Sequence, residues 1–213
     1  MSKTNTMTKT MLLAVIGGFF FAASLAQAQQ GDASLGFGTL MSSGSTSCSQ
    51  SFSGFGCAVP EKGGLYPSVN GDVIFRKRIG FDFEAAWKAT QGEYGGSGGQ
   101  PFRPIIIDFN GMYQPKLGKK LGAELLGGIG LQSTRFYGLV DSASCLDFGA
   151  CFTSSHHFLV DVGGGLRYYV WNHIFVRPEI RYYHIVNNTA DFSSNDVFRV
   201  GASIGYTIGG GTD

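Results

Sequence analysis

Residues 157–185 read HFLVDVGGGLRYYVWNHIFVRPEIRYYHI, and the fold follows from this stretch. In its first half, apolar side chains such as Phe158 and Val160 alternate with polar or small ones. After residues 171–173 the alternation resumes and continues to Tyr183. A period of two over more than ten residues indicates a β-strand with one apolar and one polar face. Globular strands average about 5–6 residues, whereas a tilted membrane-spanning strand needs about 9–11. The stretch therefore predicts a hairpin of two membrane-length strands.

The same alternation recurs along the chain, so we predict an all-β fold of eight antiparallel strands. The expected strands cover about 33–41, 66–76, 79–90, 102–114, 120–134, the two halves of 157–185, and 196–208. Their connections alternate between long loops, such as 42–65 and 135–155, and tight turns, such as 171–173. Long loops at one end and short turns with both termini at the other describe an up-and-down transmembrane β-barrel of the bacterial outer-membrane type.

Residues 1–28 are predicted to be a cleaved Sec signal peptide. A basic start is followed by a short apolar run, Met11–Leu25, and by Ala26-Gln27-Ala28, which matches the small-residue cleavage pattern. The barrel domain is then expected to occupy residues 29–213. No apolar run after residue 28 is long enough for a transmembrane helix, so membrane insertion would have to use strands.

The charge balance argues against a nucleic-acid partner. The chain has 16 Lys+Arg and 15 Asp+Glu, and the predicted signal peptide contains two of the lysines and no acid, which leaves 14 against 15. A nucleic-acid-binding protein would show a clustered basic excess. The 33 glycines accompany 14% aromatic residues, and disordered chains are poor in aromatics. The glycines must therefore serve the geometry of a folded barrel.

Four cysteines follow the signal peptide: Cys48, Cys57, Cys145 and Cys151. An even number in an exported chain predicts disulfides, for which three pairings are possible. The spacing favours the two local pairs, Cys48 with Cys57 and Cys145 with Cys151. It does not match a zinc-binding pattern, and we predict no metal and no cofactor.

Periodicity alone does not say whether the apolar face points inward, as in a soluble barrel, or outward to lipid. Three features favour lipid. Many glycines lie on the polar face, where a narrow lumen needs small residues and a solvated sheet would only lose stability. Aromatic residues gather near the strand ends, as in membrane-interface girdles. The charges on the polar face also nearly cancel, at seven acids against six bases, as expected for an enclosed ion-pair network. The predicted lumen charges are Asp72, Asp82, Glu84, Lys88, Asp108, Glu124, Asp161, Arg167, Arg177, Glu179, Arg181 and Arg199, together with Arg76.

The last predicted strand carries a short motif. Arg199-x-Gly201-x-x-Ile204-x-Tyr206 matches the polar-x-Gly-x-x-hydrophobic-x-hydrophobic assembly signal of outer-membrane barrels. With the signal peptide and the eight strands, the chain resembles the OmpA/OmpX-like outer-membrane β-barrel domain family over residues 29–208. Family members commonly end at an aromatic residue, whereas this chain continues through Ile208 to Asp213. The resemblance implies an outer-membrane protein with periplasmic termini that contacts lipid and lipopolysaccharide and is folded by the barrel-assembly machinery.

These observations favour a monomeric barrel with a structural or surface-interaction role and no enzymatic activity. Loops 42–65 and 135–155 are the expected contact surfaces, including for an extracellular protein partner, and the lumen charges are expected to act as a plug. Two alternatives stay open. One is a narrow channel or small-amphiphile transporter, and the other is a soluble periplasmic ligand-binding barrel.

Two smaller features of the sequence are ambiguous. His156 and His157 follow Ser154 and Ser155, and this combination of residue types suggests a hydrolase site. However, the alternation points His157 inward and no acidic partner lies at an obvious offset, so we predict ordinary polar residues at the rim. Arg103 points outward near a strand end, where it either contacts lipopolysaccharide phosphate or extends its charged head towards water.

Overall fold

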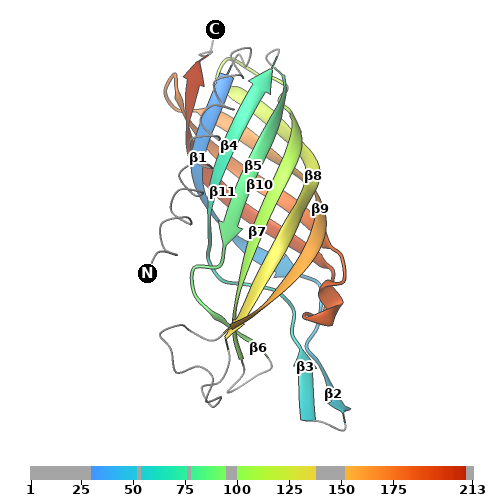
Figure 1. Ribbon diagram of the computed structural model, residues 1–213. Helices are drawn as coiled ribbons and strands as arrows, with labels where there is room; N and C mark the ends of the chain where they lie inside the picture. The colour runs from blue at the N-terminus through green and yellow to red at the C-terminus, as the bar shows by residue number, and fades with distance from the viewer. Residues whose placement is uncertain (1–29, 52–53, 76–77, 95–99, 138–151, 210–213) are drawn as a thin grey trace, which may run out of the picture.

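Alternating side chains along eight long strands build a closed antiparallel barrel in the computed structural model, which describes residues 30–51, 54–75, 78–94, 100–137 and 152–209 (Figure 1). The barrel strands are β1 (Gln30–Ser42), β4 (Tyr66–Phe75), β5 (Ile79–Trp87), β7 (Gln100–Tyr113), β8 (Leu121–Tyr137), β9 (Phe152–Tyr169), β10 (Ile174–Ile185) and β11 (Asp196–Gly209). Consecutive barrel strands pair with each other, β5 with β7 across the intervening β6. The predicted eight-stranded up-and-down architecture is confirmed, with bounds that differ from the predicted ones by a few residues.

The barrel closes where the last strand meets the first. β11 pairs antiparallel with β1 from Gln30 opposite Gly209 to Ser42 opposite Val197. The two described ends of the chain, Gln30 and Gly209, therefore lie side by side at the end that carries the tight turns. Because β1 also pairs with β4, and β11 also pairs with β10, neither β1 nor β11 has a free edge. The predicted signal peptide, residues 1–28, lies outside the described residues.

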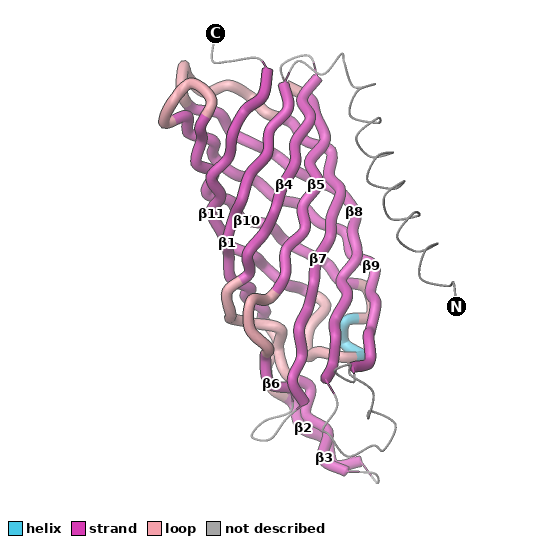
Figure 2. The backbone as a smooth tube through the Cα atoms, turned by 60° about the vertical axis from the view of Figure 1, so that its left-hand side comes forward, coloured by secondary structure: helices cyan, strands magenta, loops and turns pink. Residues whose placement is uncertain are grey.

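The opposite end carries the longer connections. The loop after β1 contains a two-stranded hairpin, β2 (Ser47–Ser51) and β3 (Gly54–Ala58), which projects beyond the barrel wall (Figures 1 and 2). A short strand, β6 (Gly92–Tyr94), extends the sheet beside β7, and a single 3-10 turn, η1 (Asn188–Ala190), lies between β10 and β11. None of these short elements was expected from the sequence. Within the described part of the chain, no helix is long and apolar enough to cross a membrane.

The burial of the wall is inverted relative to a water-soluble protein. Large apolar side chains cover the exterior and are strongly exposed, for example Leu35 (65%), Val162 (59%) and Ile204 (56%). On β10, Arg177 and Arg181 alternate with exposed residues such as Ile180 (52%) and are each 0% exposed. In water, a continuous apolar exterior of this kind would be an aggregation surface, whereas in a bilayer it faces acyl chains. The apolar face of the 157–185 hairpin therefore points outward, as the sequence predicts.

Aromatic side chains mark the two ends of this apolar exterior. At the short-turn end, Trp171 is 66% exposed and Tyr206 packs beside the ring of His173 at a centroid distance of 5.7 Å. Towards the other end, Tyr182 and Phe198 face each other on neighbouring strands with centroids 5.0 Å apart. Amphipathic rings favour the boundary between acyl chains and water. Rings at these two levels are expected to lie at the two boundaries of a membrane.

Candidate functional site in the barrel lumen

Two arginines organise the part of the lumen nearer the short turns. Arg167 on β9 contacts Asp32 and lies 2.6 Å from Asp72 and 2.5 Å from Glu124. Arg177 on β10 shares both of the latter carboxylates, at 3.1 Å from Asp72 and 3.2 Å from Glu124. All of these side chains are buried, and alternation within their strands turns them into the barrel. Because each guanidinium offers five donors in a fixed plane, it can bridge several carboxylates at once.

A second pair of arginines lies further along the lumen. Arg181 donates to Asp108 at 2.8 Å and to Asp82 at 3.0 Å, and its Nε is 3.0 Å from Glu84. Arg199 on β11 lies 2.6 Å from Glu84 and donates to Ser68 at 2.9 Å. Glu179 links the two pairs of arginines, since it contacts Arg177 at 3.3 Å and Arg199 at 3.4 Å. The buried charges thus form one connected network across the barrel.

Glycines on the lumen face make space for these long side chains. A Cβ at Gly163 would lie 2.9 Å from the Cγ of Arg181, its partner on the neighbouring strand. A Cβ at Gly205 would collide with the ring of Phe175, and that ring supports Arg167, whose guanidinium lies 4.1 Å from its centroid. Any larger residue at these positions would displace a network member. This is the geometric use of glycine that the composition suggests.

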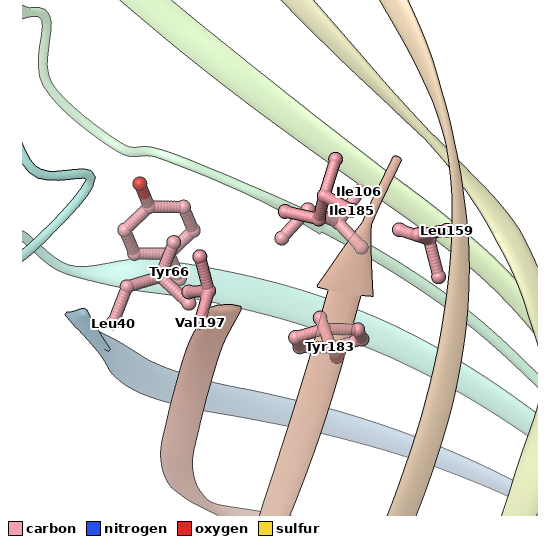
Figure 3. Packing of buried hydrophobic residues seen from close by; sticks show 7 residues of the cluster. All are labelled: Leu40, Tyr66, Ile106, Leu159, Tyr183, Ile185 and Val197. Atoms are coloured by element: carbon pink, nitrogen blue, oxygen red, sulfur yellow. The ribbon is translucent and has the colours of Figure 1, made fainter. Parts of the chain in front are cut away.

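The lumen also contains apolar layers that the sequence did not reveal. On the long-loop side of the charges, seven side chains pack together, each at most 1% exposed, and Figure 3 shows them converging from several strands. They are Leu40, Tyr66, Ile106, Leu159, Tyr183, Ile185 and Val197. A smaller group, Ile74, Met112 and Leu126, packs at the level of the charges nearer the short turns. The ion pairs therefore have apolar neighbours, which hold little water to screen them.

The mouth at the long-loop end is covered by two loops that meet over the barrel. Ser193 donates its backbone N–H to the carbonyl of Val59 at 3.0 Å, and the ring of Phe192 packs against Phe102 with centroids 5.2 Å apart. Beneath them, Glu61 is 1% exposed and accepts a hydrogen bond from Gln132 at 2.9 Å. Burial raises the pKa of Glu61 to about 7. Sequence reasoning missed Glu61 because it lies in an irregular loop with no periodic pattern.

His157 has an acidic partner that the sequence did not indicate. Its Nε2 lies 2.7 Å from Asp191 in the β10–β11 loop and 2.9 Å from the hydroxyl of Ser155. Its Nδ1 faces the carbonyl of Val186 at 3.2 Å. The expectation of no acidic partner is therefore wrong, although a Ser-His-Asp triad requires the serine and the acid on opposite ring nitrogens. Here both share Nε2, and the arrangement is that of a hydrogen-bonded rim histidine.

The remaining predicted lumen charges occupy different environments. Lys88 lies at the mouth, with its ammonium 4.7 Å from the centroid of the Phe102 ring, and makes no ion pair with the central arginine network in the described residues. Asp161 is 3% exposed, and neither of its oxygens has a hydrogen-bond donor in the part of the chain that the structure describes. Arg103 donates to the carbonyls of Lys88 and Ala89 at 2.8 and 2.6 Å, so its guanidinium caps the end of β5. Arg76 lies outside the described residues.

The buried charges do not cancel. Among the described residues, nine acids and five bases are buried, and Arg76, the sixth base expected in the lumen, lies outside the described residues. The acids are Asp32, Glu61, Asp72, Asp82, Glu84, Asp108, Glu124, Asp161 and Glu179, and the bases are Lys88, Arg167, Arg177, Arg181 and Arg199. Asp32 and Glu61 were not in the predicted set. Within the part of the chain that the structure describes, buried acids therefore outnumber buried bases.

The predicted assembly motif runs along β11 beside the closing strand. Arg199 and Gly201 turn to the lumen side, and a Cβ at Gly201 would lie 2.7 Å from the carbonyl oxygen of Phe37 on β1. Ile204 and Tyr206 are on the exterior, 56% and 52% exposed. Assembly as a function stays a prediction, and what the structure provides is a strand whose apolar motif residues face outward at the seam of the barrel.

The predicted disulfide residues are described only in part. Cys48 on β2 lies opposite Cys57 on β3 in the antiparallel register. Directly opposed residues have Cα atoms about 4.5–5.5 Å apart, a separation that falls in the disulfide range. Cys145 and Cys151 lie outside the described residues. Over the described part of the chain, no group of three or more His, Cys, Asp or Glu side chains has the geometry to hold a metal ion.

Comparison with known proteins connects this architecture to a class. No protein-family model matches the chain, and no curated protein matches its sequence. Solved structures do match the fold. Ail, the attachment invasion locus protein of Yersinia pestis, is 12% identical with a TM-score of 0.51, covering 84% of this chain and 99% of Ail. Neisserial surface protein A is 12% identical with a TM-score of 0.53, covering 83% and 95%. The outer-membrane protein OprG of Pseudomonas aeruginosa is 15% identical with a TM-score of 0.52, covering 86% and 98%.

The chain thus has the fold of the small eight-stranded outer-membrane barrels. At these identities the likeness concerns the fold, and the role of the protein has to be argued from its own residues.

Proposed function

We propose that this protein is a monomeric integral outer-membrane β-barrel with a structural and surface-interaction role, whose lumen is closed by its own side chains. The observation that carries the proposal is the inverted burial of the wall: exposed apolar residues such as Leu35 surround fully buried arginines such as Arg181. In a membrane this arrangement satisfies both sets of side chains. In water it satisfies neither, which disfavours the soluble ligand-binding alternative.

The closed lumen is supported by its contents. An eight-stranded barrel is just wide enough for side chains to fill it. Here four arginines and their carboxylates fill the middle, with the apolar group around Ile74 among them and the apolar cluster around Leu40 on the long-loop side. The rings of Phe102 and Phe192 cover the mouth. No catalytic role is assigned, because the His157 arrangement lacks the geometry of a triad.

The surface role is assigned to the long-loop end. We place the short turns, with Gln30 and Gly209, on the periplasmic side, because short periplasmic turns and longer outer loops are typical of such barrels. The hairpin of β2 and β3 then projects outward as a contact surface for an extracellular partner, held by a disulfide between Cys48 and Cys57. Two proteins of similar fold bear names that refer to attachment and to the cell surface, which supports this assignment. Lipopolysaccharide and the barrel-assembly machinery are the further partners that we expect.

Cell fractionation combined with gel mobility tests the proposal. We expect the protein in the outer-membrane fraction, and we expect the unheated protein to migrate differently from the boiled protein because a folded barrel resists detergent. Protease added to intact cells should cleave within the loops at the β2–β3 end and leave the turn at residues 171–173 intact. Recovery in the periplasm without detergent, or a mobility that does not change on boiling, would contradict the proposal.

Electrical recording in planar bilayers addresses the channel alternative. A lumen closed by the contacts of Arg177 and Glu179 should show no discrete conductance. Substituting either residue should open a measurable current only if the ion pairs are what closes the lumen. Steady conductance of the wild-type protein would favour the narrow channel.

A further inference from the structure

The strand register places a line of oxygen-bearing side chains across the lumen. Asp32 lies opposite Asp72, Asp72 opposite Asp82, and Asp82 opposite Asn110. Asn110 is opposite Gly128, which in turn is opposite Asp161. We call Asp32, Asp72, Asp82, Asn110 and Asp161 the carboxylate row, and each member is at most 6% exposed. Register partners have Cβ atoms about 5 Å apart, so neighbouring ionised carboxylates in this row repel each other.

The arginines compensate only one end of the carboxylate row. Asp32 and Asp72 contact Arg167, and Asp82 contacts Arg181 at 3.0 Å. At the other end, both oxygens of Asp161 and the Oδ1 of Asn110 have no hydrogen-bond donor within the described residues. Gly128, which lies between these two residues in the register, contributes no side chain.

Arg181 is the cation that attracts the Asp161 carboxylate most strongly, but its guanidinium already forms ion pairs with other acids. Its ion pairs go to Asp82, Glu84 and Asp108, at 3.0, 3.0 and 2.8 Å. The acids Asp82 and Glu84 both repel the Asp161 carboxylate electrostatically. Asp161 is thus a buried acid whose surroundings supply acceptors and negative charge rather than donors.

The charge count points to a missing positive partner. The described residues bury nine acids and five bases. A proton shared between Asp72 and Asp82, which face each other, and the proton that Glu61 holds in the folded mouth would neutralise two of the four excess charges. The others remain, and an uncompensated buried carboxylate costs several kcal/mol. Buried oxygen acceptors without donors, in a region of negative charge, have the ligand chemistry of a small hard cation.

The site does not fit a tightly held divalent metal. No cluster of three or more acidic or histidine side chains with metal-binding geometry occurs in the described part of the chain. Ca²⁺ and Mg²⁺ need six or more oxygen ligands in a defined arrangement. A monovalent cation that keeps part of its hydration shell needs fewer protein oxygens, and carbonyl or carboxylate oxygens serve as those ligands.

We propose that the carboxylate row binds monovalent alkali cations inside the lumen, with Asp161 and Asn110 as the ligands at the uncompensated end. The proposal rests on the membrane barrel proposed above and goes beyond it, since a closed structural barrel has no need to bind ions. The bound cations balance the charge that the arginines leave unpaired.

The stability of the folded barrel in K⁺ or in a bulky organic cation tests the proposal. The wild-type barrel is first shown to be folded by its heat-dependent gel mobility, so that a failure to form the barrel is recognised separately. Urea unfolding is then followed at constant ionic strength while N-methyl-D-glucamine chloride is replaced by KCl. We expect the unfolding midpoint to rise with each tenfold increase in K⁺, because only the small ion fits among the lumen side chains of the folded state and stabilises it.

Variants locate the effect. Asp161→Asn should abolish the K⁺ dependence and should raise the midpoint in the organic cation, because it removes an uncompensated buried charge. Glu93→Gln is the matched control, since Glu93 is an exposed acid on β6 outside the lumen, and it should keep the full K⁺ dependence. Sodium-23 relaxation of the wild-type sample, reversed by added K⁺, provides a second readout that does not depend on any variant folding.

Two results would overturn the proposal. One is a wild-type midpoint that does not distinguish K⁺ from the organic cation. The other is an infrared band of a protonated carboxyl at neutral pH that disappears in Asp161→Asn, because the charge would then be neutralised by a proton instead of a cation.

Discussion

Replacing Arg181 by methionine removes the most heavily engaged cation of the lumen. Arg181 is 0% exposed and lies within 3.0 Å of Asp82, Glu84 and Asp108. The variant leaves these carboxylates buried without their partner, and loss of one member of a buried ion pair costs about 3–5 kcal/mol. We therefore expect the free energy of unfolding of Arg181→Met to fall by about that amount.

Urea unfolding in lipid vesicles measures this change, with the fluorescence of Trp87 and Trp171 as the signal. Arg135→Met is the control, because Arg135 is exposed and contacts only the ring face of Phe152, at 5.0 Å from its centroid, among its described contacts. It should cost about 1 kcal/mol or less. Adding Asp82→Asn to Arg181→Met should recover part of the loss, since the pair is coupled. If Arg181→Met unfolds like the control, the network does not stabilise the barrel and the reasoning fails.

Three further predictions concern single positions. Gly163→Ala should destabilise the barrel by about 1–3 kcal/mol, because its Cβ would lie 2.9 Å from an arginine side chain, whereas Gly71→Ala has open space and should be neutral in the same unfolding assay. The pKa of Glu61 is raised from 4.5 to about 7, so the closed mouth holds a proton that the open mouth releases. The free energy that favours the closed mouth should therefore be greatest below pH 4.5 and should decrease as pH rises through 7, by up to about 3 kcal/mol. The protection factors of the covering loops, which are corrected for the intrinsic pH dependence of hydrogen exchange, should fall across that window in the wild type and stay constant in Glu61→Gln. Finally, Cys48 and Cys57 should resist alkylation until a reductant is added, and free thiols in the untreated folded protein would refute the proposed disulfide.

The sequence predicted the barrel because period-two alternation is a strong and local signal. Once Val176 and Ile180 are assigned to one face, Arg177 and Arg181 must lie on the other, and pairing between neighbouring strands propagates the choice around the wall. The same rule indicated why lumen positions such as Gly163 are small. The placement of the arginines therefore followed from the chain alone.

What could not be predicted depends on loops and on contacts between distant residues. Glu61 and Asp191 lie outside any alternating segment, and Asp191 reaches His157 across 34 positions of sequence. The inward apolar residue Ile106 was hidden because it lies in a continuous apolar run, 105–107, in which alternation is lost. The excess of buried acid among the described residues emerged only when the burial of Asp32 and Glu61 was known.

The wall of this barrel faces lipid with its apolar side and encloses its charges. Spin labels test this arrangement in lipid vesicles when they are attached singly along β10, from Ile174 to Tyr183, in a variant with the four cysteines replaced by serine. We expect oxygen, which partitions into lipid, to relax labels at even-numbered positions such as Val176 and Ile180 and hardly those at Arg177 and Arg181. Maximal oxygen access at the odd-numbered positions, or access of a water-soluble nickel reagent to the even-numbered ones, would contradict it.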